Sequence, residues 1–333
     1  MQGMADDVGA RPPLGGVITR SDMYFHQPRY RDYRWLETNA FTFTVPAAHM
    51  RGHIRSAFRT NLGVVESSIM VFSSGDRNTG AFDCDYTDVR HHVPIPPQNL
   101  DRYDLLSGLS VHMTKPLEEW TLRYDGAYDT AFDLHLRALM PPVHISETGT
   151  KDEGLATIRL GHLDQMMHVS GTVRIRGTDH AVDWPAWRDH SWSPRPESSS
   201  GYGTPISANF DYGSFGDSLS FFVQTRNEWE SIDRGIVHNG YLLDNGTLLR
   251  LKAGEGRYTY DDRWIITALE YELEDERGRT HLFVGEPCGF CYRGSVNLAC
   301  VRWRTSDGEV GWGEYDWHGD AEHLRHRKPP SAQ

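Results

Sequence analysis

Apolar and polar residues alternate over short stretches along most of the chain, and a two-residue period is typical of β-strands with one buried face. Residues 41–45, 68–72 and 248–253 are clear examples. Turn-forming residues separate such stretches, most clearly Asp244-Asn245-Gly246-Thr247. No amphipathic helix of more than two turns stands out. The pattern therefore predicts an all-β protein.

The predicted strands form two series of similar length. The first series covers 41–45, 53–59, 68–72, 109–113, 120–124, 130–138, 156–160 and 167–175, and the second covers 206–212, 218–224, 235–243, 248–253, 264–272, 280–286, 290–292, 299–305 and 311–317. Closing an antiparallel sheet into a barrel removes its exposed edges, and a barrel of about eight strands can hold one small ligand. We therefore predict two antiparallel β-barrels in tandem, with a ligand site near their junction.

Changes in composition suggest where these units begin and end. We expect a loose, Gly- and Pro-rich segment over 1–20, a first barrel over 21–178, a second barrel over 179–318 and a polar tail over 319–333. The aromatic stretch within 21–33 is expected to cover one end of a barrel or to act as a lid.

One short stretch concentrates the candidate chemistry. Residues 183–196 read Asp-Trp-Pro-Ala-Trp-Arg-Asp-His-Ser-Trp-Ser-Pro-Arg-Pro. The prolines predict a short strand, 187–192, with fixed ends. Alternate residues of a strand share a face, which groups Trp187 with Asp189 and Ser191, and Arg188 with His190 and Trp192.

Two roles are open for Asp189. A carboxyl group among tryptophans loses hydration, so its pKa rises and it can act as a general acid near neutral pH. A close Arg188 or Arg195 would lower that pKa instead, and Asp189 would then orient His190 or an arginine. The simpler alternative is a buried ion pair beside large core aromatics.

The segment resembles the W-x-D-H/R-x-W/F motif of the carotenoid 1,2-hydratase-like, tandem-lipocalin (AttH-like) superfamily, where it lies at the start of the second half. Its fuller form is similar to the R-D-H-S-W-x-P-R motif of a bacterial branch, with Ser193 in place of an expected glycine. Residues 161–165, 171–173, 182–183 and 311–315 resemble other stretches of that branch. The resemblance implies two lipocalin-like barrels. It also implies acid-catalysed lyase, hydratase or cyclase chemistry, without a cofactor, on a hydrophobic terpenoid or aromatic molecule.

On this basis the candidate catalytic residues are Asp189 as proton donor, with His190 and Arg188 as tuning or anchoring groups. Trp187 and Trp192 would form aromatic walls that stabilise a developing cation. The other candidate substrate-binding residues are Glu37, Arg195, Tyr202, His238, Tyr241 and Glu314, each of which is also compatible with an ordinary strand position. His162 and His168 are candidates through position or resemblance alone.

Two non-catalytic functions remain open. A lipocalin-like barrel can simply carry a hydrophobic ligand, because fold does not imply function. A structural or stress-response interaction protein would bind no ligand in either barrel.

Composition excludes several other classes. The net charge of −12 with no long basic run argues against nucleic acid partners. No apolar run approaches the roughly 18 to 20 residues of a membrane span, and the first 16 residues lack the pattern of a secretory signal, so we expect a cytoplasmic protein. Whether it forms a homodimer stays open.

Metal and cofactor motifs are weak. Cys288-Gly-Phe-Cys291 lacks a second pair of zinc ligands and a helix that would favour redox chemistry, so the four cysteines are expected to be thiols. There is no P-loop, dinucleotide fingerprint or nucleophile elbow. We therefore expect neither a metal nor a cofactor.

Overall fold

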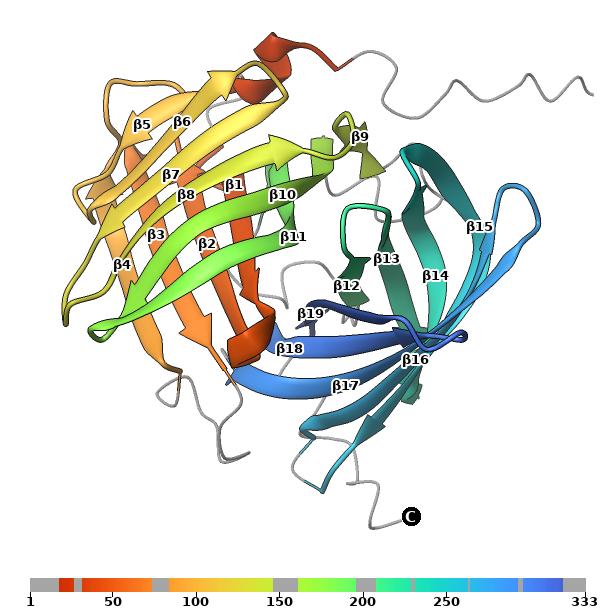
Figure 1. The fold of residues 1–333 in the computed structure, drawn as a ribbon. Coiled ribbons are helices and arrows are strands. Elements are labelled where there is room, and N and C mark those ends of the chain that lie inside the picture. Colours follow the sequence, from red (N-terminus) through yellow and green to blue (C-terminus); the bar gives the residue numbers. More distant parts are fainter. Residues whose placement is uncertain are drawn as a thin grey trace, which may run out of the picture.

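The structure is a computed structural model that describes residues 18–26, 32–73, 84–145, 161–195, 208–228, 231–262, 264–292 and 296–319. Two antiparallel sheets contain nearly all the regular structure (Figure 1). Besides the strands there are two short 3₁₀ helices, η1 (Arg20–Met23) and η2 (Pro46–Ala48). Within these ranges no helix is long and apolar enough to cross a membrane.

The first sheet has eleven strands, in the order β4-β3-β2-β1-β11-β10-β8-β7-β6-β5, with β9 paired to β10. It curls strongly, so that the hydroxyls of Tyr86 on β4 and Tyr124 on β7 lie 2.6 Å apart across the fold. The strands are β1 (Trp35–Val45), β2 (Met50–Arg59), β3 (Val64–Phe72), β4 (Tyr86–Pro94), β5 (Arg102–Asp104), β6 (Leu109–Lys115), β7 (Glu119–Asp125), β8 (Ala131–Ala138), β9 (Val143–His144), β10 (Gly161–Ile175) and β11 (Thr178–Pro194).

The second sheet is a closed barrel in which strands neighbouring in sequence pair and the last returns to the first. Its strands are β12 (Ala208–Phe215), β13 (Leu219–Glu228), β14 (Ser231–Asp244), β15 (Thr247–Tyr260), β16 (Ile266–Asp275), β17 (Thr280–Tyr292), β18 (Val296–Thr305) and β19 (Val310–His318). The predicted turn joins β14 to β15, with Asn245 and Gly246 at the positive φ angles that such a turn requires.

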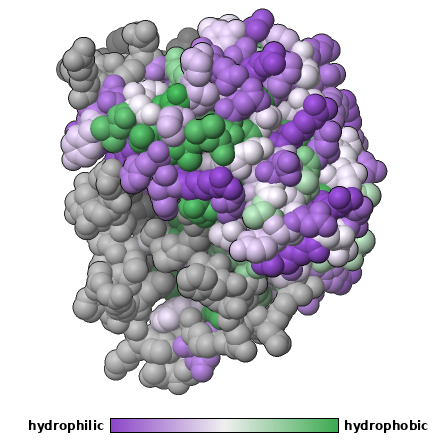
Figure 2. All heavy atoms as spheres, turned by 90° about the vertical axis from the view of Figure 1, so that its left-hand side faces the viewer, coloured by the Kyte–Doolittle hydropathy of each residue, from purple (hydrophilic) through white to green (hydrophobic). Residues whose placement is uncertain are grey.

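Burial distinguishes the strands where the two barrels meet from those facing solvent. β6, β7 and β8 alternate between buried and more exposed residues, and hydrophilic residues make up most of the described surface in Figure 2. In contrast, every residue of β1 and β12 is buried. One face of each of these strands lines its own barrel, and the other packs at the junction between the barrels.

The segment from Ile18 to His26 packs against the first barrel. Met23 is buried in the core of that barrel, and Ile18 and Phe25 pack against the same core. The main-chain N–H of Phe25 donates to the side-chain oxygen of Asn99. This part of the aromatic stretch therefore covers the barrel, which was one of the two roles expected for it from the sequence.

The expected boundary between the units is wrong. Residue 178 lies at the turn of the β10–β11 hairpin, and both strands belong to the first sheet. The motif therefore completes the first barrel instead of opening the second. The physical reason is that β11 pairs with β1 through seven residue pairs, from Trp35 with Pro194 to Phe41 with Arg188.

The motif strand is also longer than expected, because Pro185 lies inside β11 and pairs with His168. The pairing of β11 with β1 ends at Arg188. At Pro185 the edge of β11 that faced β1 therefore has no strand partner, so the missing N–H of proline breaks no hydrogen bond between strands.

Strand β4 was not predicted. The predicted strand 156–160, most of the N-terminal segment 1–20 and nearly all of the tail 319–333 lie outside the described residues.

Candidate functional site

Strand β11 separates two polar surroundings. As the alternation predicted, Trp187, Asp189 and Ser191 face the junction between the barrels, and Arg188, His190 and Trp192 face the interior of the first barrel. All six side chains are buried. A single strand therefore supplies titratable groups to both sides of the sheet.

At the junction, Asp189 belongs to a group of two carboxylates and one imidazole. Nε2 of His162 lies 2.7 Å from Oδ2 of Asp189 and 3.0 Å from Oδ1 of Asp164. His162 and Asp164 are two residues apart on β10, so they share a face, and Asp164 is the register partner of Asp189. The arginine partner considered for Asp189 is replaced by a histidine, which can itself carry or release a proton near neutral pH.

A line of hydroxyl groups leads from Asp189 towards the end of β11. The Thr38 hydroxyl lies 3.5 Å from Oδ1 of Asp189 and 2.7 Å from the Ser191 hydroxyl. Arg195 donates to the same Ser191 oxygen at 2.6 Å. The predicted residue Arg195 thus lies on the junction side of β11.

Aromatic side chains from both barrels pack beside these groups. The ring of Trp187 is nearly parallel to that of Phe222 at 6.3 Å and is stacked with Tyr212 at 6.1 Å. Tyr241 stacks on Phe222 and is fully buried, and burial followed by the charge of Asp164 raises its pKa well above the usual value. Among the described residues, neither the Tyr241 hydroxyl nor the Trp187 indole nitrogen has a hydrogen-bond partner.

Glu314 lies elsewhere at the junction, in a buried ion pair between the barrels. Arg51 on β2 donates to Oε2 of Glu314 on β19 at 2.7 Å, and Nδ1 of His53 lies 3.2 Å from Oε1. Burial acts to raise the pKa of Glu314, but Arg51 and His53 outweigh it and hold that pKa below its usual value. Glu314 therefore joins the two barrels.

Arg188 points into the first barrel. Its guanidinium lies over the ring of Trp120 at 4.5 Å and donates to Oε1 of Gln165 and to the sulfur of Met23. No carboxylate bonds to it among the described residues. Burial lowers the pKa of Arg188 to about 10, although the charge of Asp189 across the sheet opposes this shift.

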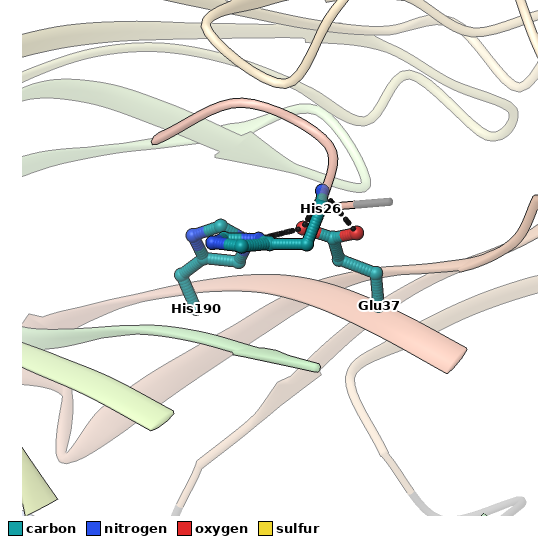
Figure 3. A group of neighbouring side chains, drawn as sticks. All are labelled: His26, Glu37 and His190. Carbon is teal, nitrogen blue, oxygen red and sulfur yellow. Dashed lines mark hydrogen bonds and ion pairs between the residues drawn. The ribbon is translucent and has the colours of Figure 1, made fainter. Parts of the chain in front are cut away.

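The same interior holds a second polar group, drawn in Figure 3. Oε1 of Glu37 lies 2.9 Å from Nε2 of His190 and 2.8 Å from Nδ1 of His26. Burial acts to raise the pKa of Glu37, but these two histidines outweigh it and lower the pKa. Burial lowers the pKa of His190, although the hydrogen bond to Glu37 and the charge of Glu37 act to raise it. The ring of His26 is stacked on Trp192 at 3.5 Å.

The structure thus divides the predicted residues between two sites. Asp189, Trp187, Arg195 and Tyr241 meet at the junction, whereas Arg188, His190, Trp192 and Glu37 meet inside the first barrel. Glu37 is fully buried and lies on a central strand, so it is not a surface acid. His238 is the extra residue of a bulge in β14, beside Arg226, and Tyr202 lies outside the described residues.

Three residues of these groups were given no role from the sequence, namely Asp164, His26 and Thr38. The sequence does contain an indication for Asp164. It lies two positions after His162, within residues 161–165, which resemble a stretch of the AttH-like superfamily. His26 gave no comparable signal, because its position depends on how the N-terminal segment packs against β1 and β11.

Comparison with solved structures supports the fold. An AttH-like protein (NE1406) from Nitrosomonas europaea aligns with a TM-score of 0.51 and 12% identity, covering 85% of this chain and 91% of the other. Kievitone hydratase from Nectria haematococca aligns with a TM-score of 0.49 and 9% identity, covering 93% and 97%. The similarity to the AttH-like protein agrees with the two antiparallel sheets described above and with the expected tandem arrangement of two lipocalin-like barrels.

No curated protein matches the sequence. A family model described as "Domain of unknown function (DUF7064)" matches residues 19–321, which span both barrels. The chain therefore belongs to the DUF7064 family.

Proposed function

We propose that this chain is an enzyme that performs acid–base chemistry, as a lyase, hydratase or cyclase, on a hydrophobic small molecule at the junction between its barrels. The observation that carries the proposal is the buried group in which His162 lies within 3.0 Å of both Asp164 and Asp189. Three titratable groups at this spacing share protons, so that one can give a proton up and regain it from its neighbours.

The surroundings suit a proton transfer to carbon. In a hydration, Asp189 would give its proton to one carbon of a double bond, and water would add to the resulting cation. That water would lose a proton to the carboxylate group, which restores the acid. The π face of the nearby Trp187 ring would stabilise a cation.

The junction also offers donors for an oxygen atom of the substrate. A buried donor without a partner costs about 1 to 3 kcal/mol, so a ligand that accepts from one gains affinity. Among the residues that the structure describes, the Tyr241 hydroxyl and the Trp187 N–H are two such donors. They favour an oxygenated terpenoid or aromatic molecule over a pure hydrocarbon.

Hydrogen exchange tests the proposal before the natural substrate is known. The purified chain is incubated in D₂O with a panel of terpenoid alkenes and hydroxylated aromatic compounds, and mass spectrometry measures deuterium incorporation and gain or loss of water. We expect Asp189→Asn to slow the exchange by about 10²- to 10⁴-fold, the usual contribution of a positioned acid.

The matched control is Asp183→Asn, which changes another acid of the same strand. Asp183 is 80% exposed and pairs with His168, not with His162, so exchange should be unchanged. If compounds quench tryptophan fluorescence on binding but wild-type protein exchanges none of them, the chain is a carrier and the proposal is wrong.

A further inference from the structure

Three side chains of a kind that binds transition metals converge inside the first barrel, on the opposite side of β11 from Asp189. They are His26 from the N-terminal segment, Glu37 from β1 and His190 from β11 (Figure 3). We infer that this group is a binding site for a divalent transition metal ion of the zinc or iron class. This inference departs from the metal-free protein expected from the sequence, and it does not depend on the reaction proposed for the junction.

The distances fit a metal site with little rearrangement. Two ligand atoms each about 2.1 Å from a metal, at a right angle to one another, lie about 3 Å apart. Oε1 of Glu37 lies 2.8 Å from Nδ1 of His26 and 2.9 Å from Nε2 of His190. Each nitrogen therefore already lies at nearly the distance from Oε1 of Glu37 that two neighbouring ligand atoms of one metal ion would have. Metal binding would release the protons that now join them.

The ligands are also held in place by their neighbours. The main-chain N–H of His26 donates to both carboxylate oxygens of Glu37, at 3.2 and 3.0 Å, and so orients that carboxylate. The imidazole of His26 is stacked on Trp192 with an angle of 9° between the rings. Glu37 and His190 are fully buried on paired central strands. Such supporting contacts are typical of metal sites.

A second group, His162, Asp164 and Asp189 at the junction, also has ligand-type atoms close together. It offers one imidazole and two carboxylates, and Nε2 of the imidazole already contacts both acids. Two imidazoles and one carboxylate suit zinc or ferrous iron better, because these ions favour nitrogen ligands more than magnesium or calcium do. The interior group is therefore the preferred site.

An ion at this position would have a defined structural effect. It would join the segment carrying His26 to β1 and β11, and so fix the cover of the first barrel. With three protein ligands, the ion would also keep at least one coordination position open for water or another ligand.

The test uses the full-length chain after treatment with a chelator. Isothermal titration with Zn²⁺ measures affinity and stoichiometry, and the visible absorption of bound Co²⁺ reports nitrogen and oxygen ligands. We expect one ion per chain. Glu37→Gln, which keeps the shape of the side chain, should weaken binding by about 100-fold or more. His26→Gln changes a ligand outside the sheet and should do the same even if the Glu37 variant folds poorly.

The matched control is Asp164→Asn, which alters the junction group and should leave Zn²⁺ affinity unchanged. Circular dichroism checks that each variant is folded. The inference is overturned if the wild-type chain binds neither ion, or if the ion is lost in Asp164→Asn and kept in Glu37→Gln and His26→Gln. The latter result would place the metal at the junction.

Discussion

Adjacent residues of the motif have different surroundings. Asp189 faces His162 at the junction, and Arg188, one position before it, lies over Trp120 inside the first barrel. A one-residue change of register would exchange these positions, so the function of each residue depends on a pairing that the surrounding strands fix. The catalytic role of Asp189 itself stays a prediction until exchange is measured.

Asp211 is a buried acid in the second barrel whose ionisation should be visible in stability. Burial raises its pKa well above the usual value. Tyr271 donates to it at 2.5 Å and the main-chain N–H of Asp316 donates at 2.9 Å, but the carboxylates of Asp316 and Glu314 oppose its charge. The hydroxyl of Tyr258 extends the group through Tyr271.

We expect this acid to make the wild-type chain less stable at higher pH. Because the folded-state pKa exceeds the unfolded one, the contribution of Asp211 is fully present below the unfolded pKa and is lost as pH rises through the folded pKa. Between those values the wild type should lose about 1.4 kcal/mol per pH unit relative to Asp211→Asn. Urea unfolding of both proteins at pH 5 and pH 8 measures the difference. Parallel stability curves would contradict the expectation.

At the scale of single elements, the β10–β11 hairpin depends on a close approach. A Cβ atom added to Gly161 would lie 2.0 Å from the ring of its partner Trp192, so the ring would have to move. Overpacking of this kind costs about 1 to 3 kcal/mol. We expect Gly161→Ala to lower the free energy of unfolding by that amount, as measured by urea denaturation.

The comparison for this change is Thr172→Ala, on the exposed part of the same strand, which should alter stability by less than about 0.5 kcal/mol. Equal stability of Gly161→Ala and wild type would mean that Trp192 has room to move. In that case its stacking on His26 would not be fixed by the hairpin.

The sequence predicts elements well where a strand has one buried face. Alternation located β6, β7 and β8, and the Asn245-Gly246 turn was confirmed. It predicted the faces of the motif correctly but not the extent of β11, because a strand buried on both faces has no alternation and Pro185 looks like an end. The assignment of β11 to the second barrel was wrong because pairing with β1 is a tertiary choice that local pattern does not encode.

The candidate site was predictable in part for the same reason. Periodicity places Asp189 on one face and His190 on the other, but it does not say which strands supply their partners. Glu37 and His190 are 153 positions apart in sequence, and His26 reaches them from a segment with no regular period. The all-β tandem-barrel fold was confirmed, whereas the expected cytoplasmic location stays a prediction.

At the scale of the whole molecule, the Arg51–Glu314 pair joins the two barrels. Removing one partner of a buried ion pair leaves an uncompensated charge and costs about 3 to 5 kcal/mol. We expect Arg51→Met to destabilise the chain by that amount, because His53 would be the one remaining partner of Glu314 among the described residues. The double variant Arg51→Met, Glu314→Gln should cost less than the sum of the two single changes.

Guanidinium unfolding followed by tryptophan fluorescence measures this double-mutant cycle. A coupling energy near zero would show that the pair contributes nothing to the attachment of the barrels. The stacked contact of Trp187 with Tyr212 and Phe222 would then be the main apolar link to test.

The pairing of β1 with β11 has a consequence for the order of events on the ribosome. β1 leaves the ribosome early, but its partner follows only after roughly 150 further residues, which takes about 8 to 30 s at usual rates of protein synthesis. Throughout that delay one edge of a strand rich in Thr and Phe has no partner and can pair with another nascent chain. The newly made protein should therefore depend on chaperones most strongly before residue 194 emerges, and synonymous codons that slow translation ahead of β11 should lower its soluble yield.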